Sequence, residues 1–439
     1  LGLVGSEMCI RDRNKIKNAT IELNGLTIIA GVNDSGKSTI GKMLFALTKA
    51  IGNMGNHNDE QRYRRIRFQA AMLYNQLSSI EKNLQINIKE KLILPPNINE
   101  FMEELMDATI ADNLLLEEKE KFTEHIDITP QQKARILRYL ENIKEEIQEN
   151  KEPQNILKKE FETIIEAEFL NNICTNGTEH SEIAFYEGTH DNNVFISLEK
   201  NKIKDISATN LTEFQINDAT FVESPLYIHL LDILASAQTL KEKRYSTAIF
   251  RPLVNYHVKD MAQKLDAIKY PFLAPSLFDD KMNAIGDITG GKFEFDNKTR
   301  NLFWKKEDVK YSPVNVASGI KAFGVMQILM ETQAINENKI LIWDEPENHL
   351  HPEWQIKIAQ LFVEIAKAGV PILISSHSPY FIQGVRYFTE KHELNKFVNY
   401  YLAKETEDGL SELEDVTKDL NQIFVKLAQP MNEIINIGM

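Results

Sequence analysis

A glycine-rich loop lies between an apolar strand and a helix near the start of this 439-residue chain. The loop reads Gly-Val-Asn-Asp-Ser-Gly-Lys-Ser over residues 31–38. Residues 26–30 before it are almost all apolar, and apolar side chains recur at helical spacing over residues 40–47 after it. A strand that turns sharply into a helix leaves free N–H groups aimed at an anion. The feature predicts an α/β fold with a phosphate site at one edge of its sheet.

Each position of this loop has a physical reason to contact a nucleoside triphosphate. Gly31 and Gly36 let the backbone come close to the phosphate oxygens. Lys37 directs a full charge at the β- and γ-phosphates, and the hydroxyl of Ser38 is a ligand for Mg²⁺. A plain glycine turn before a helix is the alternative interpretation. The predicted nucleotide-binding residues of the loop are Gly31, Asn33, Ser35, Gly36, Lys37, Ser38 and Thr39.

Two later apolar strands each end in polar side chains. Residues 340–343 lead into Asp344 and Glu345, and a second apolar run leads to His377. We expect Asp344 to hold Mg²⁺ and Glu345 to act as general base toward the attacking water. His377 is predicted to hydrogen-bond the γ-phosphate. The alternatives are a solvated helix start for the two acids and a structural role for the histidine.

A third polar motif opens a helix later in the chain. Ser318 and Gly319 precede apolar residues at helical spacing, so the first N–H groups of the helix form an anion site. An ordinary helix cap is the alternative. Lys321 either carries charge toward a phosphate or faces solvent.

The order of these motifs resembles the ATP-binding-cassette class of P-loop ATPases. Residues 344–352 (DEPENHLHP) and 376–380 (SHSPY) resemble its soluble AAA branch, which includes RecF-like repair proteins, structural-maintenance heads and OLD-family ATPases. The resemblance is specific over residues 20–52 and 310–390, loose over 176–310, and absent from the helical insertion. It implies an α/β P-loop NTPase of head type, with a mixed sheet flanked by helices and an inserted α-helical subdomain.

The resemblance also implies a homodimer with ATP and Mg²⁺ at two shared sites. In this class each nucleotide lies between the phosphate loop of one subunit and the signature of the other, so Ser318 and Gly319 would contact the partner's γ-phosphate. Here the signature reads Ala-Ser-Gly-Ile-Lys and differs from the transporter form Leu-Ser-Gly-Gly-Gln. No glutamine-bearing loop is evident. Glu223 follows a strand in the corresponding place and is predicted to contact the metal, together with Ser38 and Asp344.

Five segments are expected along the chain. Residues 1–13 (LGLVGSEMCIRDR) show no helical or strand period and resemble a translated sequencing-adapter scar, so we expect a disordered, non-native leader. An edge strand is expected from residue 16 to a turn at Asn24-Gly25, and a hairpin over residues 292–295 and 301–304. The alternation of helices and apolar strands in the last third predicts a parallel sheet covered on both faces. Helical patterns fill residues 58–171, in segments too short for a long coiled coil, with a break at Pro95-Pro96 and a cap at Thr129-Pro130. The predicted segments are the leader 1–13, an N-terminal ATPase part 14–57, the helical insertion 58–171, a second lobe of strands and helices 172–310, and a C-terminal ATPase part 311–439.

Composition limits the choice of partners. The net charge of −14 and pI of about 5.3 argue against a general coat of positive charge for nucleic acid. A cluster of arginines with aromatic neighbours, residues 62–68, leaves nucleic-acid contact open, with a solvated helix end as the alternative. Two cysteines without metal spacing and the lack of a long apolar run predict a cytoplasmic protein without membrane contact.

The leading hypothesis is therefore a nucleotide-driven dimer switch in a bacterial DNA-related or anti-phage system, acting on a separate effector protein. Roughly sixty residues follow His377, which is too few for a catalytic domain of typical size, so we expect no intrinsic nuclease. The alternatives are the ATP-binding subunit of a membrane transporter and a nucleotide-binding scaffold without turnover.

Overall fold

The computed structural model describes residues 5–56, 66–67, 69–73, 129–148, 152–170, 173–175, 178–188, 191–231, 233–234, 254–270 and 278–437. The chain divides into a larger unit, Leu1–Gly52 with Leu157–Met439, and a smaller unit, Asn53–Ile156. The helical insertion was predicted over residues 58–171. Most of its last helix, α7 (Pro153–Phe169), instead belongs to the larger unit.

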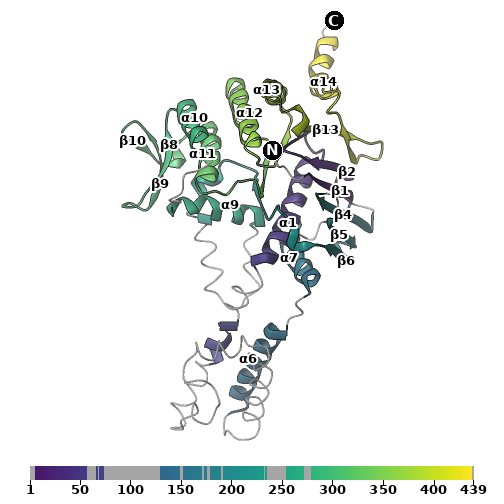
Figure 1. The fold of residues 1–439 in the computed structure, drawn as a ribbon, viewed down its shortest axis with the longest axis vertical. Helices are drawn as coiled ribbons and strands as arrows, with labels where there is room; N and C mark the ends of the chain where they lie inside the picture. The colour runs from purple at the N-terminus through teal and green to yellow at the C-terminus, as the bar shows by residue number, and fades with distance from the viewer. Residues whose placement is uncertain are drawn as a thin grey trace. The chain divides into compact units, whose positions relative to one another are not determined.

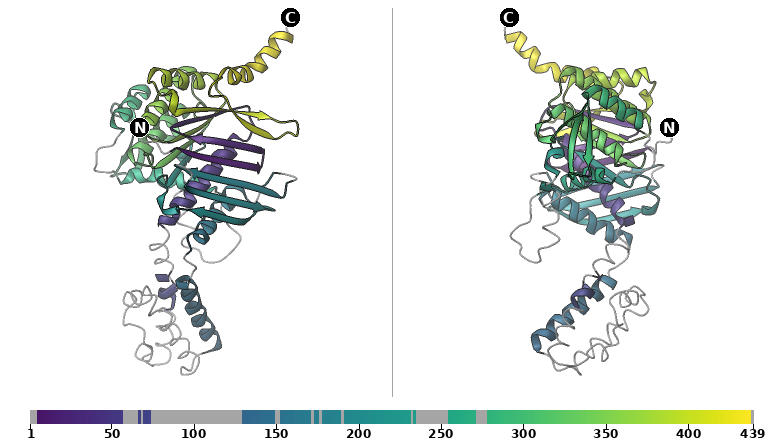
Figure 2. Two further views of the ribbon diagram at one scale, coloured as in Figure 1. Left: turned by 45° about the vertical axis from the view of Figure 1, so that its right-hand side comes forward. Right: turned by 90° about the vertical axis from the view of Figure 1, so that its left-hand side faces the viewer.

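One mixed sheet organises the larger unit. Its strand order is β6-β5-β4-β1-β2-β14-β13-β3-β12-β11-β7. The strands are β1 (Ser6–Arg13), β2 (Ile16–Leu23), β3 (Leu26–Ala30), β4 (His180–Glu187), β5 (Asn192–Glu199), β6 (Lys202–Thr209), β7 (Asp218–Val222), β11 (Lys339–Asp344), β12 (Ile372–Ser376), β13 (Val398–Glu405) and β14 (Ser411–Asp415). Figure 2 shows β1 and β2, in purple, between the teal strands β4–β6 and the yellow-green strands β13 and β14.

The two halves of this sheet differ in direction and in burial. Strands β13, β3, β12, β11 and β7 run parallel to one another, and every residue of β3 and β12 is buried. Strands β2, β1, β4, β5 and β6 form an antiparallel meander in which buried and exposed residues alternate. Continuous apolar runs belong to strands covered on both faces, and alternation belongs to strands with one solvated face. The parallel half was predicted from such runs.

Helices cover both faces of the parallel half. Alternate side chains of β11 point to opposite faces: Ile342 lies under Gly41 of α1 (Lys37–Asn56), whereas the ring of Trp343 lies 5.5 Å from that of Phe362 in α12 (Pro352–Lys367). Phe381 of α13 (Pro379–Lys391) packs in turn on Phe362, and α12 and α13 lie side by side (Figure 1). The prediction of a parallel sheet with helices on both faces is confirmed.

The remaining elements of the larger unit surround this core. They are the α-helices α9 (Tyr256–Asp266), α10 (Asp279–Thr289), α11 (Ser318–Glu331) and α14 (Asn421–Ile437), and the 3₁₀ turns Leu211–Glu213, Ala267–Lys269, Pro313–Asn315 and Asn395–Phe397. A separate small sheet of β8 (Lys292–Asp296), β9 (Asn301–Lys306) and β10 (Val309–Tyr311) packs beside α11. Its β8–β9 hairpin was predicted from the sequence.

Two sequence-based predictions are wrong at the start of the chain. Residues 6–13 are not disordered, because β1 pairs with both β2 and β4 and buries Met8 and Ile10. Without β1, the facing edges of β2 and β4 would each leave backbone groups unpaired. The strand beginning at Ile16 was also predicted to be an edge strand, whereas β2 lies inside the sheet, separated from β3 by β14 and β13.

The smaller unit is described only in part. Helix α6 (Pro130–Gln148) begins with a capping box, in which Gln132 N–H donates to Thr129 Oγ1 at 3.3 Å and Thr129 N–H donates to Gln132 Oε1 at 3.0 Å. The predicted cap at Thr129-Pro130 is therefore confirmed. The predicted break at Pro95-Pro96 and the arginine cluster, apart from Arg67, lie outside the described residues. No helix in the described part of the chain is long and apolar enough to cross a membrane.

Candidate nucleotide-binding site

The register of four parallel strands brings the predicted site residues to one edge of the sheet. Ala30 at the end of β3 pairs with Ser376, and Ser375 pairs with Asp344. Trp343 pairs with Val222, so Asp344 and Glu223 follow neighbouring strands at the same level. Ligands of open α/β sheets bind at the carboxyl ends of the strands. Sequence motifs more than 300 residues apart therefore meet here.

The loop after β3 has the strained backbone of a phosphate cradle. Gly36 has φ +81° and Asp34 has φ +61°, both in the left-handed region. A Cβ on Gly31 would lie 2.9 Å from Ser35 Oγ and 3.0 Å from Ala403 Cβ, so the first glycine leaves no room for a side chain. Ser35 Oγ is buried without a hydrogen-bond partner among the described residues. An unpaired buried hydroxyl in the loop fits a ligand that supplies acceptor oxygens.

Lys37 lies inside this loop. Its Nζ donates to the carbonyl oxygens of Gly31 at 3.0 Å and Val32 at 2.8 Å, and the residue is 5% exposed. Burial lowers the pKa of Lys37, while the nearby carboxylates Glu345, Asp344 and Glu347 act in the opposite direction. The first i→i−4 bond of α1 runs from Ile40 N–H to Gly36 O, so the N–H groups before it are directed at the loop.

Ser38 and Asp344, two of the three predicted Mg²⁺ ligands, are already in contact. Ser38 Oγ donates to Asp344 Oδ2 at 2.6 Å, and Ser375 Oγ donates to Asp344 Oδ1. Mg²⁺ in nucleotide sites takes one or two protein oxygens and completes its shell with phosphates and waters. This hydroxyl and carboxylate fit such an ion. Elsewhere in the described part of the chain, no group of three or more His, Cys, Asp or Glu side chains forms an all-protein metal site.

Glu345 and His377 form a second contact at the same edge. His377 Nδ1 lies 3.0 Å from Glu345 Oε1, and Asn348 Nδ2 donates to Glu345 Oε2 at 2.9 Å. Glu345 has φ +48°, a conformation that costs energy for a residue with a side chain and that clusters at functional sites. Its N–H donates to Ser375 O at 3.0 Å, which fixes this turn to β12. The structure therefore brings the predicted general base and the predicted phosphate sensor together.

Glu347 was given no function by the sequence reasoning, although it stands within the Asp-Glu-Pro-Glu run. Its Oε1 accepts hydrogen bonds from Ser376 Oγ at 2.7 Å, His377 N–H at 2.9 Å and Ser378 N–H at 3.1 Å. Burial raises the pKa of Glu347, although these hydrogen bonds oppose the rise. The carboxylate holds the chain around His377 in place. Its position two residues after the predicted general base was the signal available in the sequence.

The signature residues lie at the start of α11. The N-cap residue Ala317 offers no side-chain hydrogen bond, and a Cβ on Gly319 would lie 3.1 Å from Leu350 Cδ2 and 3.3 Å from the Trp354 ring. Gly319 thus has a packing reason as well as a predicted phosphate contact. Within the described residues, no hydrogen bond or ion pair joins Ser318 or Gly319 to the phosphate loop of the same chain.

Lys321 points inward and so does not face solvent, which was one of the two alternatives drawn from the sequence; charge toward a phosphate stays a prediction. Its Nζ lies 3.2 Å from His229 Nδ1, and the residue is 5% exposed. Burial lowers the pKa of Lys321, and burial together with the lysine charge lowers that of His229. In this structure Lys321 faces neither solvent nor the phosphate loop.

Glu223 lies at the predicted edge but has three protein partners. Its carboxylate is 3.1 Å from His257 Nε2 and 3.3 Å from Lys42 Nζ, and it accepts from the Tyr227 hydroxyl at 2.8 Å. The hydrogen bond from His257, the charge of Lys42 and the hydrogen bond from Tyr227 lower the pKa of Glu223 to about 2, against the effect of burial. Metal contact by Glu223 stays a prediction.

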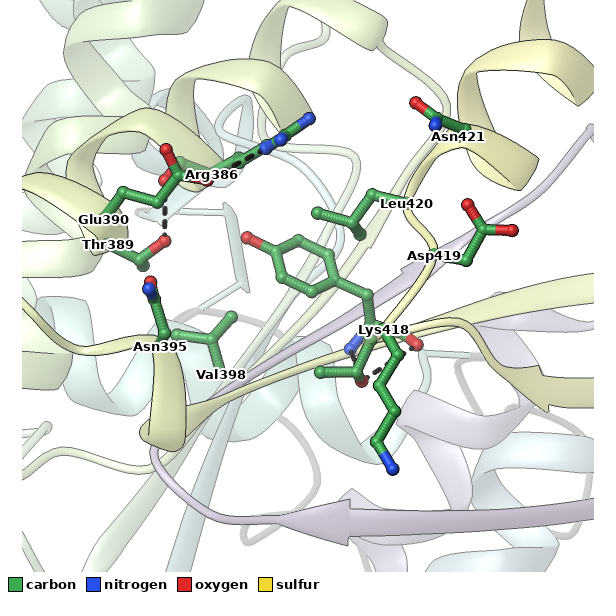
Figure 3. Close-up of a pocket in the computed structure, with 11 residues that line it drawn as sticks. Arg386, Thr389, Glu390, Asn395, Val398, Lys418, Asp419, Leu420 and Asn421 are labelled. Atoms are coloured by element: carbon green, nitrogen blue, oxygen red, sulfur yellow. Dashed lines mark hydrogen bonds and ion pairs between the residues drawn. The ribbon is translucent and has the colours of Figure 1, made fainter.

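A cavity of about 300 Å³ lies away from these motifs, between α13 and the start of α14. Figure 3 shows Arg386 and Glu390 on one side of it and Lys418 and Asn421 on the other. None of the predicted nucleotide-site residues lines this cavity.

Comparison with solved structures gives distant similarities. The Smc head bound to the C-winged helix domain of ScpA has 11% identity and a TM-score of 0.41, over 95% of this chain and 98% of that one. The SMC head domain from Thermotoga maritima has 11% identity and a TM-score of 0.37, over 94% and 99%. A Smc head with an extended coiled coil, bound to the C-terminal domain of ScpA derived from Pyrococcus furiosus, has 10% identity and a TM-score of 0.38, over 96% and 98%.

A search of curated proteins gives no match. A family model described as AAA ATPase domain matches residues 10–382, which include the phosphate loop, the signature, the Asp344-Glu345 strand end and His377. The match covers most of the chain. Together with the site geometry described above, it shows that the chain belongs to the AAA ATPase domain family and is an ATP-binding ATPase of the P-loop type.

Proposed function

We propose that this ATPase hydrolyses ATP in a Mg²⁺-dependent reaction and works as a head-to-head homodimer. ATP binding closes the dimer, and hydrolysis with product release opens it. The observation that carries the proposal is the convergence of Lys37, Ser38, Asp344, Glu345 and His377 at one sheet edge. They supply the phosphate charge, the metal ligands, the base and the phosphate sensor that phosphoryl transfer to water requires.

The chemistry follows from the positions of these side chains. Lys37 and the N–H groups at the start of α1 bind the β- and γ-phosphates. When bound at Ser38 and Asp344, Mg²⁺ supplies positive charge that offsets the charge on the phosphate oxygens. Glu345, fixed by Asn348 and His377, orients the attacking water and accepts its proton. His377 is held by Glu347 within reach of the γ-phosphate.

The dimer completes each site. Ser318 and Gly319 stand at a helix start that has no side-chain cap and no contact with the phosphate loop of the same chain, within the described residues. A helix N-terminus stabilises an anion placed on its axis. We therefore assign Ser318 and Gly319 to the γ-phosphate bound by the partner subunit. Each chain contributes two half-sites, one with the phosphate loop and one with the signature.

Substitution of the general base tests this arrangement. Glu345→Gln keeps the ATP contacts and removes the base, so it should slow turnover by about a hundredfold or more and accumulate an ATP-bound dimer on sizing. Lys37→Ala is the matched control, which should abolish turnover and remain monomeric. A Glu345→Gln protein that stays monomeric with ATP contradicts the two-headed model, and unchanged hydrolysis by Lys37→Ala contradicts the phosphate-loop assignment.

The biological process is proposed at a coarser level. The similarity of residues 344–352 and 376–380 to RecF-like and OLD-family proteins supports a cytoplasmic role in a DNA-related or anti-phage system with a separate effector protein. On this proposal the chain itself does not cut DNA. Incubation of the highly purified protein with plasmid and Mg²⁺ or Mn²⁺ tests the point, and metal-dependent cleavage that survives purification would contradict it.

A further inference from the structure

A buried imidazole bridges two carboxylates beside the nucleotide site. His257, at the start of α9, is 0% exposed. Its Nδ1 lies 2.8 Å from Glu168 Oε2 in α7, and its Nε2 lies 3.1 Å from Glu223 Oε2 after β7. The backbone N–H of His257 also donates to Glu168 Oε1 at 2.6 Å. Glu168 therefore grips this residue through both carboxylate oxygens.

Each nitrogen of the His257 ring has a carboxylate partner. A neutral histidine has one donor nitrogen and one acceptor nitrogen, whereas both nitrogens of His257 face carboxylate oxygens. An ionised carboxylate only accepts hydrogen bonds, so these two contacts fit a ring in which both nitrogens donate, which is the imidazolium form. Burial opposes this charge, but the hydrogen bonds and charges of Glu168 and Glu223 raise the pKa of His257. Lys42 Nζ lies 3.3 Å from the other oxygen of the Glu223 carboxylate.

Glu223 connects this cluster to the ligand edge. It follows Val222, which pairs with Trp343, so Glu223 and the Mg²⁺ ligand Asp344 stand on adjacent strands. Its other oxygen contacts Lys42, one helical turn after Ser38 on α1. The carboxylate is thus held between the helix that carries the phosphate loop and the imidazolium of α9.

A second charge cluster lies further along α9. Lys49 of α1 lies 2.7 Å from both Asp218 and Asp260, and Lys264 lies 3.1 Å and 2.9 Å from the same two carboxylates. We call these four residues the α9 charge ring. The α9 charge ring joins α9 to α1 and β7. The imidazole of His257 packs against the aromatic ring of Phe221, with 4.9 Å between their centroids. Figure 1 shows α9 near α1 and α7. Glu168 is the direct anchor of His257, and the α9 charge ring shares no residue with that contact.

We propose that His257 is a positioning residue of the ATPase: anchored by Glu168, it holds the Glu223 carboxylate in one orientation beside Asp344 and Lys42. This rests on the proposed ATPase function and extends it to residues that do not touch the nucleotide. Loss of the support frees Glu223 and the first turns of α1 to shift relative to Asp344. Backbone contacts of the loop and the charge of Lys37 stay, so turnover suffers more than ATP binding.

Four full-length variants test the proposal by steady-state kinetics and thermal unfolding. They are His257→Gln, Glu168→Gln, the corresponding double variant, and Lys264→Met as the control. His257→Gln and Glu168→Gln should each lower kcat by about tenfold to a hundredfold with KM for ATP changed by less than about threefold. The double variant should be no slower than the slower single variant, because both substitutions remove the same support. Lys264→Met breaks the α9 charge ring and should lower Tm without the loss in kcat.

Several outcomes would overturn the proposal. An unchanged kcat in both single variants, additive losses in the double variant, or an equal kcat loss in Lys264→Met would reduce His257 to a packing role. If the His257 variants do not fold, the kcat of Glu223→Gln tests the proposal instead. The Glu223 side chain is 40% exposed, so this variant should fold. A wild-type kcat in Glu223→Gln would contradict the proposal. Unchanged turnover in Lys37→Ala, with all other residues wild-type, would instead refute the ATPase proposal itself.

Discussion

Glu347 shows how one buried carboxylate can shape a site without touching the ligand. A single oxygen accepts three hydrogen bonds from residues 376–378, and the residue is 3% exposed. Two of the donors are backbone N–H groups at the turn between β12 and α13, and the Ser378 N–H also donates to Ser376 Oγ at 3.2 Å. The turn carries His377. At this scale the site depends on residues that orient the reacting groups as much as on those groups themselves.

Glu347→Ala should lower both stability and turnover. The substitution leaves buried donors unsatisfied, which should reduce the free energy of unfolding by about 1–3 kcal/mol. His377 loses its anchor and kcat should fall, while Lys37 continues to bind the nucleotide. Denaturant unfolding and an ATPase assay on the same protein measure the two effects. A stable variant with wild-type kcat would show that Glu347 does not position His377.

At the scale of elements, α1 is held against the sheet by close backbone approach. A Cβ on Gly52 would lie 1.7 Å from the carbonyl oxygen of Asn217, just before β7. The backbone of Asn217 cannot move aside to relieve this contact as a flexible side chain could. The same helix begins at the phosphate loop and carries Lys42 and Lys49. Its position on the sheet therefore determines both the phosphate loop and the ion pairs of these two lysines.

Gly52→Ala should therefore destabilise the protein by about 1–3 kcal/mol or more, because α1 must move away from Asn217. Gly5→Ala is the matched control, since nothing lies within 4 Å of a Cβ at that position. Thermal unfolding of both variants measures the difference. Equal Tm values would contradict the close approach of α1 and the residue before β7.

The α9 charge ring predicts a second element-scale effect. Lys49→Met leaves two largely buried carboxylates facing one lysine, and the free energy of unfolding should fall by about 3–5 kcal/mol. Despite burial, Lys264 and Lys49 lower the pKa of Asp218. A carboxylate whose pKa is lower in the folded state stabilises the fold above its unfolded pKa of about 4 and loses that contribution as pH falls below it.

The pH dependence supplies the check on the ring. Wild-type stability should decline as pH falls below about 4, and Lys49→Met should show a weaker decline because the pKa of Asp218 moves back toward its unfolded value. Urea unfolding at several pH values measures both slopes. If the free energy of unfolding falls with pH at the same slope in the wild type and in Lys49→Met, Lys49 does not stabilise the ionised Asp218.

At the scale of the whole molecule, features with a local sequence pattern could be predicted, whereas pairings between distant parts of the chain could not. The glycine loop, the Asp344-Glu345 strand end and the His377 strand end each carry their own signal, and parallel register then brings them together. The position of β2 could not be predicted, because its neighbour β14 comes from a distant part of the chain and its neighbour β1 lies in residues that were expected to be disordered. His257 and Glu168 gave no local signal either, since their contact joins residues 89 positions apart.

The proposed sharing of sites between two chains can be tested by mixing two inactive variants. Lys37→Ala lacks the phosphate half-site, and Ser318→Arg places a bulky charge in the signature half-site. Each variant alone should be inactive. In a mixed dimer one pocket combines the intact loop of one chain with the intact signature of the other, so an equal mixture should regain about a quarter of the wild-type rate. Full activity of Ser318→Arg alone, or no recovery on mixing, would contradict shared sites.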